Sequence, residues 1–298
     1  MDGTRVGGSE PPFPSERPVS DAAAASEQVI EVTLDGFDEL MLVSAATPDA
    51  EADAVIAAES FDIESIIRVE SPAWCESLAV FDLETTGIDI ETSRIVSAHV
   101  GVIDGAGHPV EGRSWLADPG VEIPDGAVAV HGISTERARA EGRRAAEVVA
   151  EILEALREVL GRGLPLTIYN APYDLSLLNR EALRHGLEPL IDPSPVIDPL
   201  VIDKAMDRYR PGKRTLVAAS RQYGVLLDDA HDSRADAIAA GRVAQAVARR
   251  YPAELGMDIE TLHLAQVGWC ADQAERFQDY MRRERDPGFA ADGSWPQR

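Results

Sequence analysis

The feature that most constrains the fold of this 298-residue chain is an apolar segment that ends in two closely spaced acids. Residues 77–84 (SLAVFDLE) carry four successive apolar side chains, which is typical of a strand buried inside a sheet. Side chains two residues apart on a strand leave the same face, so the carboxylates of Asp82 and Glu84 should lie together. Two like charges at the end of a core strand are costly unless cations compensate them, and carboxylate oxygens suit Mg²⁺ or Mn²⁺.

The residues that follow decide between a metal site and a strand that simply ends in a polar turn. For an isolated pair of acids at this spacing, the polar turn is the better interpretation. Here Thr85, Thr86 and Gly87 come next, and glycine permits close approach of another backbone or a ligand. We therefore interpret residues 82–87 as part of a candidate metal site.

The rest of the chain predicts a mixed sheet covered by helices on both faces. Three strands come first, followed by strands that alternate with helices. The expected strands are 77–84, 94–104, about 109–117, 164–170 and the end of one at 195–198, with a loop over 118–134. The expected helices are 145–161, about 174–185, 199–208, 214–223, 233–250 and a long one within 256–285.

The acidic residues are unevenly distributed along the chain. The formal net charge of −24 argues, by itself, against a phosphate-rich partner. Residues 1–71, however, hold 16 of the 52 acids and only 3 of the 28 bases. We predict that 1–71 is an acidic, largely disordered N-terminal extension, that 72–252 is the main domain, and that 253–298 is a C-terminal helical extension.

Several classes of protein are disfavoured by simple counts. There is no run of 18 apolar residues, and the first twenty residues lack a basic patch followed by an apolar stretch, so we expect no membrane association and no secretory signal. The two cysteines, Cys75 and Cys270, lie far apart and form no CxxC pair. We therefore expect a cytoplasmic protein without a disulfide framework or a thiolate zinc site.

Three segments together resemble the DEDDh-type 3′–5′ exonucleases, a family that includes the proofreading subunit of bacterial replicative DNA polymerase, ribonuclease T and oligoribonuclease. The first is 81–87 (FDLETTG), and the second is 169–175 (YNAPYDL), which follows a predicted strand. The third is 231–236 (HDSRAD), in which a histidine is followed after four residues by an aspartate. The resemblance spans about residues 77–250 and fills every catalytic position of the family.

The resemblance implies a ribonuclease H-like α/β fold with a mixed five-stranded sheet. It implies that Asp82, Glu84, Asp174 and Asp236 bind two divalent cations, Mg²⁺ or Mn²⁺, and that His231 is the general base. Nucleoside 5′-monophosphates would be released from the 3′ end of a nucleic acid. Thr85, Thr86 and Gly87 would lie against the terminal sugar and base, and Asn170 would contact the substrate.

Each of these residues also has a structural interpretation. Asp174, taken alone, would be the N-cap of the predicted helix, and Asp236 would complement the dipole of the helix that begins near residue 233. A lone exposed His231 would be inert, whereas a base beside activated water needs such an exposed site. We expect Asp232 to be an N-cap, and Asp198 and Asp203 to be structural.

Two further segments are candidate substrate contacts. Residues 129–134 (AVHGIS) resemble an HGI element that family members carry near the terminal nucleotide, so His131 either contacts substrate or fills a gap beside a helix that Ser134 caps. The run 204–214 (KAMDRYRPGKR) contains five bases and one acid. Lys213 and Arg214 in this run either hold substrate phosphates or belong to a solvated loop and helix start.

Taken together, the residues and the resemblance predict a metal-dependent 3′–5′ exonuclease, with DNA favoured over RNA as the substrate. The partner is a single-stranded or frayed 3′ end, with a DNA polymerase as a further candidate. The alternatives are an RNA-trimming enzyme of the same family and a catalytically silent module that binds nucleic acid or a polymerase. The apolar face of the C-terminal helix either packs on the core or binds a partner, and the oligomeric state stays open.

Overall fold

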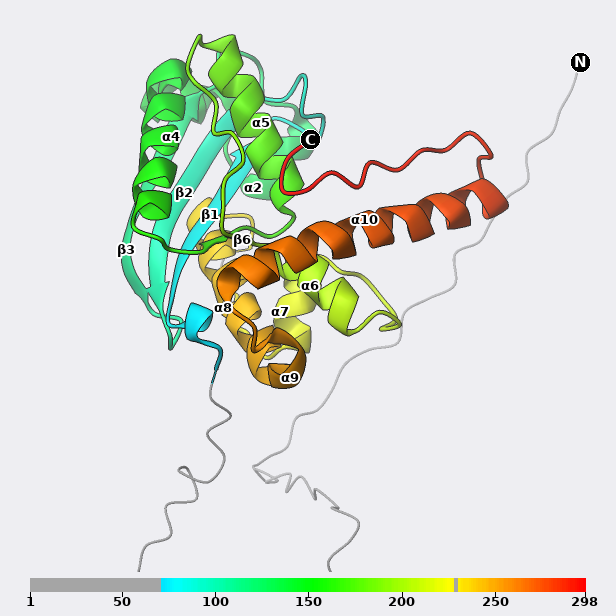
Figure 1. The fold of residues 1–298 in the computed structure, drawn as a ribbon. Helices are drawn as coiled ribbons and strands as arrows, with labels where there is room; N and C mark the ends of the chain where they lie inside the picture. The colour runs from blue at the N-terminus through cyan, green and yellow to red at the C-terminus, as the bar shows by residue number, and fades with distance from the viewer. Residues whose placement is uncertain (1–70, 228–229) are drawn as a thin grey trace, which may run out of the picture. The chain divides into compact units, whose positions relative to one another are not determined.

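A computed structural model describes residues 71–227 and 230–298, and these form a six-stranded mixed sheet with the order β4-β3-β2-β1-β5-β6 (Figure 1). The predicted extension 1–71 therefore lies outside the described residues, except for Ser71. Strands β1 to β3 are antiparallel, whereas β5 and β6 run parallel to β1. The strands are β1 (Ser77–Thr85), β2 (Ile95–Asp104), β3 (Pro109–Asp118), β4 (Arg143–Arg144), β5 (Leu166–Thr167) and β6 (Val196–Ile197).

The prediction of a mixed sheet is confirmed, but the number of strands is six rather than five. The additional strand, β4, consists of two exposed arginines that pair in parallel with Ala117 and Asp118 at the end of β3. A strand of two polar residues has no periodicity that a sequence could reveal. Pairing with the neighbouring strand is what defines it.

The helices cover both faces of the sheet, as predicted. They are a short 3₁₀ helix η1 (Ala73–Cys75), α2 (Asp125–His131), α3 (Thr135–Glu141), α4 (Ala145–Gly161), α5 (Ala171–Arg184), α6 (Pro199–Met206), α7 (Leu216–Gln222), α8 (Ser233–Arg250), α9 (Pro252–Leu255) and α10 (Ile259–Glu284). Among the described residues, none of these helices combines the length and the apolar character that crossing a bilayer requires.

The predicted loop over 118–134 is wrong, because this segment contains helix α2. Pro124 precedes the helix, and Gly132 ends it in the left-handed conformation, with φ of 71°. Proline before the first turn and glycine just past the last turn are common helix boundaries. Ser134 then caps α3 by accepting a hydrogen bond from the Arg137 amide. The glycines and prolines of this segment thus mark the ends of helices.

Apolar side chains of β1 point alternately to the two faces of the sheet. Phe81 and the other side chains on its face are buried against α4 and α5, whereas Val80 packs with α6, α7 and α8 on the opposite face. Helix α8 lies so close to β1 and β2 that a Cβ built at Gly241 would be 2.5 Å from Ile103 Cδ1 and 2.7 Å from Val80 Cγ1. This close packing brings the N-terminus of α8 beside the acidic end of β1.

The C-terminal segment 253–298 packs back onto the core. Helix α10 contacts α6 and β6, where Leu262 and Gln266 are fully buried (Figure 1). The chain after α10 returns to α5, where the Arg298 amide donates to Ser176 Oγ at 2.8 Å and Trp295 is buried. Phe277, in the distal half of α10, remains 51% exposed. Core packing therefore accounts for the first half of α10, and the predicted partner surface is limited to the second half.

Candidate active site

Asp82 and Glu84 lie on the face of β1 that α8 covers, as the alternation of side chains predicts. They pair across the strands with His99 and Ser97 of β2, and the register shifts after Glu84. Such an irregularity ends the regular ladder and re-aims the chain that follows. Asp82 is half-buried and Glu84 is only 9% exposed. Two acids are thus withdrawn from bulk water at one point of the sheet.

Asp174 reaches the same point from α5 on the other side of β1. The helix begins at Ala171, three residues earlier than predicted, so Asp174 lies inside its first turn. The Asp174 carboxylate accepts a hydrogen bond from the Leu83 amide at 3.1 Å. The N-cap interpretation of Asp174 is therefore wrong, and the Asp198 carboxylate instead accepts from the amides of Asn170 and Ala171 at 3.0 and 2.9 Å.

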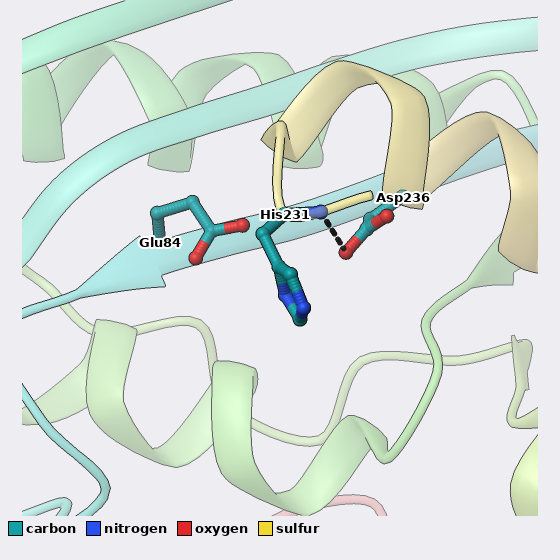
Figure 2. A group of neighbouring side chains, drawn as sticks. All are labelled: Glu84, His231 and Asp236. Carbon is teal, nitrogen blue, oxygen red and sulfur yellow. Dashed lines mark hydrogen bonds between the residues drawn. The ribbon is translucent and has the colours of Figure 1, made fainter. Parts of the chain in front are cut away.

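His231 lies just before α8, and Asp236 lies in the first turn of that helix. His231 has a left-handed backbone with φ of 73°, and its amide donates to Asp236 Oδ2 at 3.3 Å. Asp232 caps α8 by accepting from the amides of Arg234 and Ala235, as predicted. One ligand atom from each of Glu84, His231 and Asp236 lies within 4.8 Å of the others (Figure 2). The exposed His231 ring therefore faces the same space as two of the acids.

The four acids perturb one another strongly. Burial, followed by the charges of Asp174, Asp236 and Glu84, holds the pKa of Asp82 well above its usual range. Burial and the charge of Asp236 raise the pKa of Glu84 to about 8. The pKa of Asp174 is likewise raised by burial. Gathering four carboxylates in one half-buried place is unfavourable unless protons or cations neutralise them.

The donor set fits hard divalent cations. Carboxylate oxygens are the ligands that Mg²⁺ and Mn²⁺ prefer in proteins. Asp236 Oδ1 is buried and has no hydrogen-bond partner among the described residues. A buried oxygen of this kind normally carries a bond, so a cation beside it would satisfy both its charge and its lone pairs.

The turn after Glu84 is held by hydroxyl groups. Thr85 Oγ1 lies 2.6 Å from the Tyr173 hydroxyl, and both hydroxyls contact the Gly87 carbonyl, at 2.7 Å for Thr85 and 2.5 Å for Tyr173. Thr86 Oγ1 accepts from the Arg94 amide at 2.9 Å. Sequence reasoning missed Tyr173, although it stands next to Asp174 in the second motif.

Comparison with known proteins identifies the family. A family model described as exonuclease matches residues 79–244, which is more than half of the chain. The matched range contains the four clustered acids and His231. The chain belongs to the exonuclease family. It is a DEDD-type member of the ribonuclease H-like superfamily, which agrees with the sequence-based resemblance.

The chain is similar in sequence to parts of longer proteins. It is 31% identical over 188 residues to a DNA polymerase III subunit epsilon-like protein of Rhodobacter capsulatus, covering 62% of this chain and 25% of that protein. It is 30% identical to a PolC-type DNA polymerase III of Streptococcus thermophilus, covering 55% of this chain and 10% of that protein. The chain thus spans at most a quarter of these relatives. E. coli exonuclease I in complex with a dT13 oligonucleotide has a similar fold, with a TM-score of 0.51, 22% identity, and coverage of 60% of this chain and 42% of that one.

His131 lies at the end of α2, at the edge of the active site. Its Nδ1 accepts from the Ile133 amide at 3.1 Å, so the neutral ring carries its proton on Nε2. Nε2 is buried and has no hydrogen-bond partner in residues 71–227 and 230–298. His131 and His231 line one cavity of about 300 Å³. The cavity that His131 shares with His231 supports the substrate interpretation of His131, which stays a prediction.

Two arginines of the basic run 204–214, Arg210 and Arg214, hold the fold. Arg214 donates to Asp203 Oδ2 at 2.9 Å and to backbone carbonyls, and Arg210 also contacts this fully buried carboxylate. The Tyr223 hydroxyl donates to Asp203 Oδ1 at 2.6 Å. The guanidinium of Arg214 is thus engaged within the fold, and its substrate role stays a prediction. The structural roles expected for Asp198 and Asp203 are confirmed, and Lys213 and Asn170 remain exposed.

Proposed function

We propose that this protein is a metal-dependent 3′–5′ exonuclease that releases nucleoside 5′-monophosphates. The observation that carries the proposal is the convergence of Asp82, Glu84, Asp174, Asp236 and His231, which come from three separate elements, at the end of β1. Asp236 Oδ1 is buried in this cluster and has no hydrogen-bond partner within 71–227 and 230–298, which supports a cation site. All five family positions are occupied, which favours an enzyme over a silent binding module.

The four carboxylates would hold two divalent cations, Mg²⁺ or Mn²⁺. When bound, such cations lower the pKa of the attacking water and stabilise the leaving 3′-oxygen. An imidazole nitrogen of His231 would accept the proton of the attacking water, because the ring is exposed and lies beside Glu84 and Asp236. The water oxygen forms a bond to phosphorus, and the bond from phosphorus to the 3′-oxygen breaks.

The terminal nucleotide would lie between the turn 85–87 and the cavity lined by His131. The protonated Nε2 of His131 would donate to a polar group of the substrate. The Thr85–Tyr173 pair would act indirectly, by holding the Gly87 carbonyl and so keeping the turn in place. Lys213 and Asn170, which are both exposed, would contact the strand.

We propose DNA as the preferred substrate and a 3′ end as the point of attack. Support comes from relatives whose names identify them as parts of DNA polymerase III and from the exonuclease I structure that contains an oligodeoxynucleotide. A DNA polymerase is correspondingly the proposed protein partner. For the layout of the chain we propose an acidic extension at 1–71, an exonuclease domain at 72–252 and a helical extension at 253–298.

The deciding experiment measures degradation of single-stranded DNA, mismatched primer-template and short RNA, with Mg²⁺, with Mn²⁺ and with a chelator. Asp82→Ala should abolish metal-dependent hydrolysis while the circular dichroism spectrum is retained. Glu122→Gln is a matched control, because Glu122 is an exposed acid in the loop between β3 and α2. Undiminished hydrolysis by Asp82→Ala would refute the proposal. Binding of oligonucleotides without any hydrolysis by the unaltered protein would instead support the silent module.

A further inference from the structure

A second cavity, of about 460 Å³, lies between α6, α10 and the chain that follows α10. We call it the α6–α10 cavity, and its walls include Asn170, Lys204, Gln273, Phe277, Phe289 and Arg298. Cavities that hold small ligands typically measure about 300–1,000 Å³ and combine apolar walls with a few polar groups. Most of this wall comes from residues beyond 244, where the family match ends. The cavity is therefore a feature that the C-terminal segment adds to the exonuclease fold.

Two cations line the wall, and among the described residues one of them is unpaired. Lys204 forms no ion pair within the part of the chain that the structure describes, and Arg298 Nε lies 3.9 Å from Asp292 Oδ2, with both side chains about half exposed. Lys204 and Arg298 both line the cavity.

The acids on the wall are already engaged. The Asp198 carboxylate accepts from the amides of Asn170, Ala171 and Leu200 and from Trp295 Nε1. Asp292 accepts from the Ser294 amide at 2.9 Å. Lys204 lies on the cavity wall and carries no ion pair within the described residues, so its ammonium group is free to attract a phosphate.

An aromatic pair forms the outer wall. The rings of Phe277 and Phe289 lie 5.4 Å apart at 86°, which is an edge-to-face arrangement. Phe277 is 51% exposed, so one face of this ring remains open. Every nucleobase has a flat face that stacks on such rings, and each stack contributes about 1–3 kcal/mol. Gln273 Nε2 donates to the Val201 carbonyl, which leaves its Oε1 for a ligand.

The cavity and the candidate acids are linked through α5. Asn170, on the cavity wall, immediately precedes α5, and Asp174 lies in the first turn of that helix. In Figure 1, α10 and the returning chain flank α6 and the start of α5. A strand whose 3′ end occupies the active site could therefore enter the cavity with a nucleotide that lies upstream.

We propose that the α6–α10 cavity binds a nucleotide, with its phosphate on Lys204 and Arg298 and its base on Phe277. The nucleotide is an upstream unit of the substrate strand or a free mononucleotide. The first source rests on the proposed exonuclease function, and the second does not. In the first case the cavity favours longer substrates, because only these reach from the catalytic acids to Lys204.

The test compares oligodeoxynucleotides of two to ten residues as substrates for the full chain and two variants. Lys204→Met removes the charge and keeps an apolar side chain of similar length, and Phe277→Ala removes the ring. For an upstream nucleotide, both variants raise KM for the decamer about tenfold, as the loss of one charged contact or one stack implies. KM for the dinucleotide and kcat for both substrates stay unchanged. Arg250→Met, at the far end of α8 from His231, is the matched control.

Calorimetric titration with thymidine and adenosine 5′-monophosphates distinguishes the second source. It is carried out with a chelator in the Asp82→Ala background, so that no cation attracts phosphate to the catalytic acids. A free mononucleotide is identified as the ligand by two results together. The monophosphates bind saturably and Lys204→Met weakens this binding about tenfold, while the variants cause no change in KM that depends on oligonucleotide length. If the same binding is found but the unaltered protein hydrolyses no substrate, nucleotide binding in the α6–α10 cavity is supported and the proposed exonuclease function is refuted. Variants that change neither KM nor nucleotide binding, or that change KM equally at all lengths, overturn the proposal.

Discussion

The clustered acids predict that divalent cations stabilise this protein much more at pH 8 than at pH 5. In the absence of metal, burial and the charge of Asp236 raise the pKa of Glu84 from 4.5 to about 8. A carboxyl whose pKa is raised in the folded state favours folding while it is protonated. Its contribution is therefore present in full below pH 4.5 and is lost as the pH rises to about 8.

The magnitude follows from the separation of the two pKa values. At about 1.4 kcal/mol per pH unit, a rise from 4.5 to about 8 corresponds to about 5 kcal/mol. Because the neighbouring acids share the repulsion with Glu84, we take about half, or 2–3 kcal/mol. Cations at about a hundred times their dissociation constant contribute a similar amount, about 2.7 kcal/mol. For a domain of this size, 2–3 kcal/mol corresponds to a rise in Tm of about 4–12 °C.

The assay is thermal unfolding followed by circular dichroism at pH 5 and pH 8, with Mg²⁺, with Mn²⁺ and with a chelator. We expect the full rise in Tm at pH 8 and less than about a third of it at pH 5, where protons already neutralise the cluster. The double variant Asp82→Asn, Glu84→Gln should melt higher than the unaltered protein when the chelator is present at pH 8, and should respond little to metal. Equal metal effects at the two pH values, or an unchanged response in the double variant, would refute the reasoning.

Three further predictions concern packing and charge. Gly241→Ala should destabilise the fold by about 1–3 kcal/mol in urea unfolding, because the added Cβ would clash with Ile103 and Val80. Gly126→Ala is the control, because no described atom lies within 4 Å of a Cβ at that position. Equal effects of the two variants would contradict the prediction. Gln266→Leu leaves the Asp198 amide and the Val196 carbonyl unpaired and should cost about 1–3 kcal/mol per group, so an unchanged urea midpoint would contradict this account of α10. Deleting residues 1–70 should preserve kcat and tighten DNA binding at low salt but not at high salt; anisotropy titrations that show no salt-dependent difference would exclude repulsion by the acidic extension.

Short-range patterns in the sequence determined the chemistry of the site. The spacing of Asp82 and Glu84 places both on one face because a strand has a period of two residues, whatever packs around it. The order of the three motifs, with His231 five residues before Asp236, identified the family and predicted five active-site residues. The long helix 145–161 was likewise predictable, since its apolar periodicity and final glycine are local signals.

Tertiary structure decided how each side chain is used. Asp174 could be an N-cap or a site acid by its position in the helix, and only the proximity of the Leu83 amide on β1 distinguishes the two. The positive charge of Arg214 made it a candidate for binding phosphate. In the folded chain its guanidinium donates to the buried carboxylate of Asp203. In the sequence, Gln266 is a polar residue on the apolar face of the C-terminal helix. In the structure, its side-chain amide bonds the Asp198 amide and the Val196 carbonyl. These partners are remote in sequence, and a local pattern cannot encode a contact that exists only after the elements have packed.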